Sequence, residues 1–572
     1  MTTRSDLHDR IRGRLDFLYG PRGDDCFSKL MEIVDRHAEQ FCPPQPRLWD
    51  QSDIVLITYA DQIRQQDGPA LPALTRFLTE EGLDRLINTV HLLPFYPYSS
   101  DDGFSVIDYR QVAEDVGGWE DVRGLGEHVG VMFDLVLNHV SQHSQWFQHY
   151  LAGREPYTNY FIEADTEEDL SGVTRPRSLP LLTPFETSRG TRHVWTTFSD
   201  DQIDLNFAEP AVLCEMIDIL LFFVRQGARI VRLDAIAYLW KQIGTSCIHL
   251  PQTHEVVKLC RDVLEAVAPH VLLISETNVP HEENVSYFGN GDEAHLVYQF
   301  SLPPLLLDAF LSQDATPLTN WLSTLETPVD GTTYFNFTAS HDGVGVRPLE
   351  GLVEPERFDR LVQAVRDRGG KVSTKRNPDG SDSPYELNIT YFDALGRPEG
   401  ISPELHARRF LSTQAVMLAL QGVPGIYFHS LVGTPNDYLG VKQSGIPRRI
   451  NRRKYEFDEL QSCLGAGSST QRLVYQGYQK LLETRIAQPA FHPQASQEVI
   501  PTDQPALLAF SRTSLDEKQR ILVVANTSAA PRVFELPNGF SNTTHDLLSE
   551  DTPISHGTVR LAPYQAVWLE NA

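Results

Sequence analysis

The sequence predicts a protein of the α/β class, a (β/α)8 TIM barrel followed by a small antiparallel β domain. Three observations lead to this prediction. From residue 52 onward, eight short apolar segments alternate with amphipathic helical patterns. Polar and charged residues gather at the ends of four of these segments. After about residue 500 the pattern changes to short, alternating strands.

The barrel is expected to occupy residues 51–500 and the β domain residues 501–572. The eight expected strands share a β-branched, apolar character and are 54–59, 89–93, 131–137, 229–233, 271–275, 296–300, 333–337 and 425–428. Helical periodicity is clearest between them at 210–225, 254–266 and 404–421. In the last domain, strands are expected at 506–511, 520–524, 533–536 and 565–569.

Residues 1–50 are expected to form a helical N-terminal extension. Apolar residues recur at helical spacing over 6–18 and 27–41, and Pro43, Pro44 and Pro46 close the segment. The segment carries no chemical motif, so we expect it to serve packing or assembly.

Two connections are too long for plain strand-to-helix loops. The insertion at about 140–209 follows the third strand, and the insertion at about 343–403 follows the seventh. Loops of this length in a compact domain are usually functional, so both are expected to act as lids over the barrel mouth.

The composition is that of an ordinary globular protein, with 41% hydrophobic and 22% charged residues among 572. The formal net charge of −27 argues against partners such as nucleic acids or anionic membranes. The six cysteines have no paired or framework spacing, which favours free thiols in a reducing compartment. No apolar signal-peptide core and no membrane-length apolar window is present, so a cytoplasmic location is expected.

Four polar residues at strand ends carry the chemistry. Arg232 and Asp234 lie on one face of an otherwise apolar strand, where burying them is costly unless they have a function. Two neighbouring carboxyl groups can cleave a glycosidic bond with retention, one as nucleophile and one as acid and then base. We expect Arg232 to lower the pKa of Asp234, and burial to raise that of Glu276. Asp342 supplies a third carboxyl group.

A single acid at a strand end is more often a helix N-cap or a loop ligand than a catalytic group. Here four strands deliver polar groups to the same rim, and together they favour an active site: Asp134, Asn138 and His139; Arg232 and Asp234; Glu276; His341 and Asp342.

These residues lie within motifs that resemble those of the α-amylase superfamily (glycoside hydrolase family 13). The four segments are 134–139 (DLVLNH), 228–234 (ARIVRLD), 275–277 (SET) and 339–342 (ASHD), and the resemblance extends over about 52–572. Within the superfamily, segments 57–60, 91–97, 99–108, 341–345 and 449–452 resemble the sucrose phosphorylase branch. The N-terminal extension and segments 173–185, 195–206, 244–250 and 383–388 are most similar to the glucosylglycerate phosphorylase type.

The resemblance implies roles position by position. Asp234 matches the family nucleophile, Glu276 the acid/base and Asp342 the transition-state stabiliser. The matching glucosyl-binding positions are Asp101, His139, Arg232 and His341, with Phe104 and Tyr238 as aromatic walls and Arg448 as a glucose and phosphate contact. At Glu386 the chain departs from the glutamine of the sucrose enzymes, which argues against sucrose as the donor.

The resemblance implies reversible phosphorolysis of an α-glucoside, in first place 2-O-α-glucosylglycerate, to α-glucose 1-phosphate and glycerate. Phosphate and glycerate are anions, so Arg175 and Arg177 join Arg448 as candidate acceptor contacts, with solvated loop arginines as the alternative for the first two. Sucrose, sucrose 6-phosphate and glucosylglycerol phosphorylases, a plain α-glucosidase and a non-catalytic amylase-like subunit remain alternatives. Neither a metal nor a cofactor is expected, and a homodimer is one expected assembly.

Overall fold

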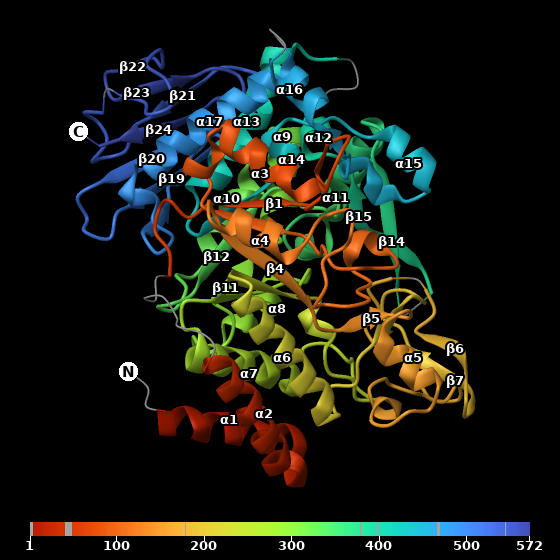
Figure 1. Cartoon of the computed structure of the whole chain (residues 1–572). Coiled ribbons are helices and arrows are strands. Elements are labelled where there is room, and N and C mark those ends of the chain that lie inside the picture. The colour runs from red at the N-terminus through yellow and green to blue at the C-terminus, as the bar shows by residue number, and fades with distance from the viewer. Residues whose placement is uncertain are drawn as a thin grey trace.

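The computed structural model describes residues 4–571 except 40–47, 178, 378–379, 397–399, 466–468 and 544. A closed barrel of eight parallel strands lies at its centre, in the order β1-β16-β12-β11-β10-β9-β4-β3. Figure 1 shows the barrel surrounded by helices, with the N-terminal helices and the C-terminal strands at opposite ends of the molecule. The predicted fold class is therefore confirmed.

All eight predicted strands are present, with ends that shift by one to a few residues. They are β1 (Val55–Thr58), β3 (Thr89–Leu92), β4 (Gly130–Val136), β9 (Ala228–Asp234), β10 (Leu272–Ser275), β11 (Leu296–Tyr298), β12 (Thr333–Phe337) and β16 (Val423–Tyr427). Each is buried nearly throughout, because helices cover the outer face and packed side chains fill the interior.

Helices follow the strands as the periodicity predicts. The three clearest patterns correspond to α6 (Pro210–Arg225), α7 (Pro251–Val267) and α13 (Pro403–Ala419), and each has proline in its first turn, where no backbone donor is needed. Other helices of the outer layer are α3 (Ala70–Glu80), α4 (Trp119–Gly126), α9 (Leu302–Ser312), α10 (Thr316–Thr324) and α17 (Thr470–Ile486). No helix of the described chain combines the length and apolarity that crossing a membrane requires.

The two long insertions contain secondary structure of their own. The first carries β5 (His139–Ser141), α5 (Gln145–Leu151), the hairpin β6 (Leu182–Thr187) and β7 (Gly190–Trp195), and β8 (Gln202–Asp204). The second carries α11 (Pro355–Asp367), α12 (Tyr391–Ala394) and a sheet of β13 (Val344–Gly345), β15 (Asp382–Asn388) and β14 (Lys371–Arg376). Both insertions leave from carboxyl ends of barrel strands, so they cover one end of the barrel.

The N-terminal extension consists of α1 (Arg4–Tyr19) and α2 (Gly23–Ala38), packed on α7 and α6. Arg14 anchors it, donating to Asp262 at 2.6 Å and to Glu255 at 3.0 Å on α7. The three prolines predicted to close the extension lie outside the described residues.

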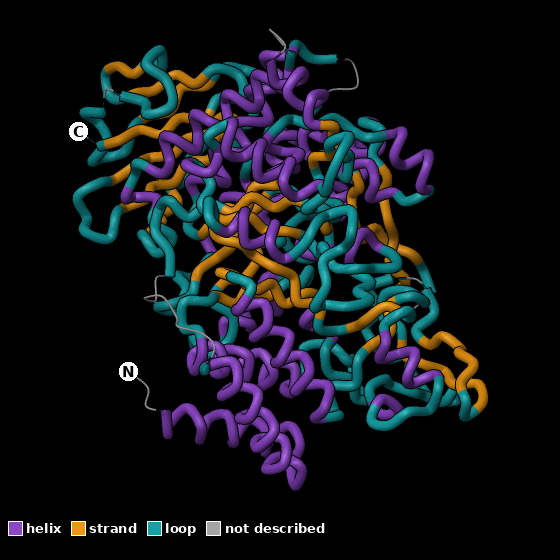
Figure 2. The backbone as a smooth tube through the Cα atoms, viewed as in Figure 1, coloured by secondary structure: helices purple, strands orange, loops and turns teal. Residues whose placement is uncertain are grey.

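The C-terminal domain contains two small antiparallel sheets, visible as the cluster of strands around the C-terminus in Figure 2. One is β18 (Ser496–Val499), β19 (Leu507–Thr513), β20 (Arg520–Asn526) and β24 (Ala566–Glu570), and the other is β21 (Arg532–Glu535), β23 (Thr558–Leu561) and β22 (Ile554–Ser555). Buried Arg512 joins this domain to the barrel by donating to the carbonyls of Ala419 (2.6 Å) and His492 (2.8 Å).

Gly425 on β16 has no room for a side chain, because a Cβ atom would lie 2.4 Å from Cζ of Phe335 in the barrel interior. We expect Gly425→Ala to lower the free energy of unfolding by about 1–3 kcal/mol through overpacking. Gly124→Ala on α4 is the matched control, because nothing lies within 4 Å of its Cβ and alanine favours a helix by about 0.5–1 kcal/mol. Denaturant unfolding measures both; equal stability of the two variants would contradict the prediction.

Candidate active site

Strand β9 places Arg232 and Asp234 on the same face, as the alternation of side chains predicts. Arg232 is 3% exposed, and its Nη1 donates to Asp234 Oδ1 at 2.7 Å and also to Asp134 Oδ1 on the neighbouring strand β4. The strand register places Arg232 opposite Asp134. One buried guanidinium therefore compensates two buried carboxyl groups.

Glu276 follows strand β10, the other neighbour of β9. The backbone N–H of Ala235 donates to Glu276 Oε2 at 3.0 Å, and Arg232 Nη2 lies 3.8 Å from the same oxygen. Asp234 and Glu276 thus flank one guanidinium, as expected for two carboxyl groups acting on a single bond.

Asp342 follows strand β12 and completes the set of acids. Arg448 Nη1 contacts its Oδ1 at 2.7 Å, and the three acids line one cavity at the carboxyl ends of the barrel strands. The structure therefore brings together the three carboxyl groups that the sequence singled out.

The pKa values of the acids separate according to their surroundings. Burial raises the pKa of Glu276, as expected, although Arg232 opposes the effect. Burial acts against the charged form of Asp342 too, but Arg448, His341, Arg452 and Arg232 outweigh it and hold its pKa well below the usual range.

The expectation that the pKa of Asp234 is lowered is wrong, although Arg232 itself acts in the expected direction. Burial raises that pKa, and the charges of Glu276, Asp134 and Asp342 raise it further against the effect of Arg232. Burial is the largest cause, and Arg232 contacts Asp134 as well as Asp234. Arg232 contacts Asp234 at 2.7 Å and Glu276 at 3.8 Å, so its charge favours the ionised form of Asp234 more than that of Glu276.

Most of the residues matched to glucosyl binding line the same cavity, namely Asp101, Phe104, His139, Arg232 and His341. The rings of Phe104 and His341 stack at 4.6 Å and 7°. Burial lowers the pKa of His139 to about 4 and that of His341 to about 3, so both are neutral near pH 7. Tyr238 lies behind the cavity wall, with its ring edge-on to Phe198 at 5.5 Å.

The three candidate cations occupy different positions. Arg448 reaches Glu386 with two parallel contacts of 3.1 and 3.0 Å, and Arg177 Nη2 lies 3.3 Å from Asp101 Oδ2; all four residues line the cavity. Arg175 instead donates to the carbonyl of Leu179 within its own loop and is not among the lining residues.

Four further lining residues with polar or aromatic side chains were not singled out from the sequence: Phe198, Gln202, Asn278 and Tyr385. Three of them lie inside segments that carried the family resemblance, 195–206 and 383–388, and Asn278 lies two residues beyond Glu276. The resemblance was therefore the signal that could have identified them.

No group of three or more His, Cys, Asp or Glu residues suited to a metal is found in the described chain. The oxygens beside the motif of Asn138 already contact a cation, because Lys241 Nζ lies 2.5 Å from Asn138 Oδ1 and 2.6 Å from Asp204 Oδ2. The ammonium group of Lys241 therefore contacts the oxygens that could otherwise bind a cation such as calcium.

Three acids in one cavity at the mouth of a (β/α)8 barrel, two of them beside a buried arginine, are typical of the enzymes that act on glycosidic bonds. Comparison with known proteins narrows the class. Residues 83–343 match the family model of the α-amylase catalytic domain, and residues 497–568 match that of the maltogenic amylase C-terminal domain. The chain belongs to the α-amylase family.

The similarity to several proteins extends over the whole chain. The glucosylglycerate phosphorylase of Spirochaeta thermophila is 46% identical over 98% of both chains, and that of Escherichia coli is 44% identical over 99% of this chain and all of its own. The sucrose phosphorylase of Agrobacterium vitis is 32% identical over 72% of this chain and 84% of its own. The crystal structure of a sucrose 6F-phosphate phosphorylase from Thermoanaerobacter thermosaccharolyticum matches with a TM-score of 0.72 at 27% identity, covering 83% of this chain and 94% of that one.

The different positions of the two loop arginines lead to a prediction. Arg177→Ala should lower kcat/KM by about 10–100-fold, because a cation that contacts Asp101 in the cavity is lost. Arg175→Ala is the matched control and should change kcat/KM less than about threefold. Steady-state kinetics of both variants with glucose 1-phosphate and acceptor provide the measurement; a larger loss for Arg175→Ala would contradict the assignment.

Proposed function

We propose that this protein catalyses the reversible, retaining phosphorolysis of an α-glucoside, 2-O-α-glucosylglycerate, with phosphate to give α-glucose 1-phosphate and glycerate. The observation that carries the proposal is similarity over the full length to three curated glucosylglycerate phosphorylases at 44–46% identity. The three acids that the reaction needs converge in one cavity. The enzyme is thus a glycosyltransferase of the disaccharide phosphorylase type.

The first half of the reaction transfers the glucosyl group to the protein. A carboxylate oxygen of Asp234 attacks the anomeric carbon, and the bond from that carbon to the glycerate oxygen breaks. The electron pair stays on the leaving oxygen, which takes the proton of Glu276. Asp342, kept ionised by the neighbouring arginines, stabilises the positive charge that develops on the sugar ring.

The second half returns the glucosyl group to phosphate. A phosphate oxygen attacks the anomeric carbon from the vacated face, the ester bond to Asp234 breaks, and Glu276 takes up the proton of the attacking phosphate. Two inversions give net retention at the anomeric carbon. No cofactor takes part, and inorganic phosphate is a substrate.

The acceptor side of the cavity suits an anion in spite of the acidic background of the chain. Arg177 and Arg448 line it, and a guanidinium fork matches the oxygens of phosphate or of a carboxylate. Both arginines already contact acids: Arg177 contacts Asp101, and Arg448 contacts Glu386 and Asp342. Phosphate or glycerate therefore has to compete with these carboxylates, which makes Glu386 a residue that affects acceptor choice.

The remaining parts of the proposal concern partners and location. The partners are the small-molecule glucoside, phosphate and glycerate, with neither nucleic acid nor membrane, and a homodimer is the proposed assembly. A cytoplasmic location is supported by five scattered cysteines that are free thiols in the described chain.

An acceptor panel tests the proposal. The protein is incubated with glucose 1-phosphate and glycerate, fructose, fructose 6-phosphate or glycerol, and released phosphate is measured. We expect release with glycerate. Release with another acceptor but none with glycerate would assign a sucrose, sucrose 6-phosphate or glucosylglycerol phosphorylase instead, and free glucose without any acceptor would indicate a hydrolase.

The separate roles of the two acids lead to a second prediction. Glu276→Gln should lose about 10²–10⁴-fold in kcat with glucosylglycerate but much less with α-glucosyl fluoride, because fluoride leaves without a proton. Asp234→Asn should lose activity with both donors, since the nucleophile itself is changed. Equal losses of Glu276→Gln on both donors would contradict its role as acid.

A further inference from the structure

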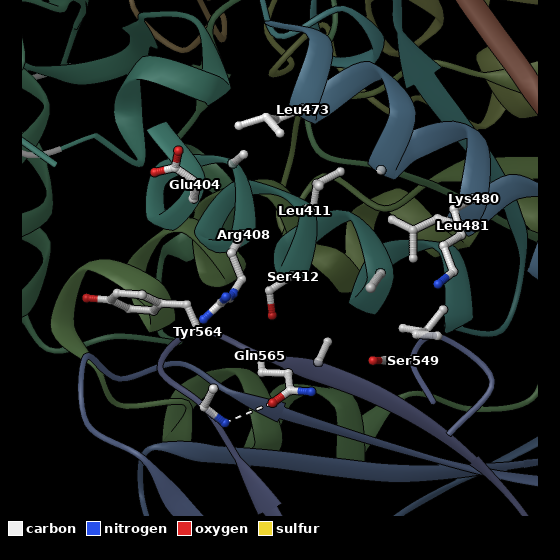
Figure 3. A pocket seen from close by; sticks show the side chains of 16 residues that line it. Glu404, Arg408, Leu411, Ser412, Leu473, Lys480, Leu481, Ser549, Tyr564 and Gln565 are labelled. Carbon is white, nitrogen blue, oxygen red and sulfur yellow. Dashed lines mark hydrogen bonds between the residues drawn. The ribbon is translucent and has the colours of Figure 1, made fainter. Parts of the chain in front are cut away.

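A cavity outside the active site lies at the junction between the barrel and the C-terminal domain. Its volume is about 440 Å³, and its walls come from α13, α17 and the β domain near β24. Figure 3 shows the 16 side chains that line it. Ligand sites are frequent at such domain junctions, and this volume falls within the range of small-molecule pockets.

The walls of the cavity are mainly apolar. Leu411 on α13, Leu473 and Leu481 on α17 and Leu548 of the β domain are among the lining residues. The two helices approach closely at Gly477, where a Cβ atom would lie 2.2 Å from Leu411 Cδ1. Glycine at this position therefore lets Leu411 of α13 pack directly against α17 beside the cavity.

Two cations line the cavity, on opposite sides of it (Figure 3). Arg408 on α13 and Lys480 on α17 line the cavity, both are exposed, and neither makes an ion pair with any residue that the structure describes. The chain carries 76 acidic residues against 49 Lys and Arg. Two cations without an acidic partner at one cavity are therefore unusual for this chain. Glu404, one turn before Arg408, is the single acid among the 16 lining residues.

A buried hydroxyl group faces the same space. Ser412 is 3% exposed, and its Oγ has no hydrogen-bond partner among the described residues. Figure 3 shows Ser412 and Arg408 pointing from α13 toward the segment that carries Tyr564 and Gln565. A buried polar atom without a partner costs free energy, which a ligand oxygen would recover.

We propose that this cavity is a second ligand site, which binds a small amphiphilic anion with an apolar body and a carboxylate head, such as a medium-chain fatty acid. The leucines receive the apolar body, Arg408 binds the carboxylate and Ser412 donates to one of its oxygens. Lys480 adds positive charge on the opposite side of the cavity. A sugar fits less well, because Tyr564, the one aromatic side chain of the lining, is fully buried and offers no stacking face. The site is separate from the residues of the proposed phosphorolysis.

Displacement of the fluorescent anion 8-anilinonaphthalene-1-sulfonate from the full-length protein by decanoate tests the proposal. Each methylene between octanoate and dodecanoate should tighten binding by about fourfold, because it buries further apolar surface. Decanol and decyltrimethylammonium, which lack the negative charge, should bind at least about tenfold more weakly than decanoate. Glucose 1-phosphate should not displace the dye.

Variants locate the binding. The double variant Arg408→Glu/Lys480→Glu should weaken decanoate binding by at least about tenfold, and Ala562→Trp should abolish it by filling the cavity. Arg560→Glu is the matched control, an exposed charge reversal on β23 outside the cavity. Circular dichroism and the thermal midpoint verify that each variant is folded.

Unchanged decanoate binding in both the double variant and Ala562→Trp would overturn the proposal, as would decanol binding as tightly as decanoate. A concentration-dependent dimer that the double variant abolishes, without decanoate binding, would overturn it in favour of a second copy of the chain.

Discussion

The active site depends on one buried cation. Arg232 contacts Asp134 from β4, Asp234 from its own strand and Glu276 after β10, so three carboxyl groups on three adjacent strands share its charge. A buried carboxylate without a partner is strongly destabilised, and replacing the arginine would leave several of them uncompensated. The three strands β4, β9 and β10 must therefore stay paired in this register for Arg232 to compensate the carboxyl groups at their ends.

A second network of charges lies beside the first and joins the insertion after β12 and the loop after β3 to the barrel. Arg452 is fully buried, donates to the carbonyl of His341 and pairs with Asp102 at 2.6 Å, while Arg448 joins Asp342 to Glu386. Asp102 has a left-handed backbone, with φ at 51°, which a tight turn at the cavity rim imposes. In a chain with net charge −27, these arginines concentrate positive charge where anions are proposed to bind.

Environment rather than residue type distinguishes the three acids. Asp342 lies among arginines and has a lowered pKa, whereas Asp234 and Glu276 are buried beside each other with raised pKa values. Both lie beside the same guanidinium, and the charge of Arg232 favours the ionised form of the nearer group, Asp234. The contact of Arg232 with Asp234, the proposed nucleophile, is about one ångström shorter than its contact with Glu276, the proposed acid.

The sequence by itself determined the barrel, its eight strands and the three acids, because hydrophobic alternation and polar strand ends are local signals. It also determined the α-amylase family, through motifs whose order the chain preserves. Only the tertiary structure decided that Arg175 turns back onto its own loop while Arg177 reaches Asp101, since both arginines lie two residues apart in the same motif. It also decided the raised pKa of Asp234 and the cavity at the barrel–β-domain junction. Both arise from side chains distant in the chain, whose burial and shared charges no local pattern encodes.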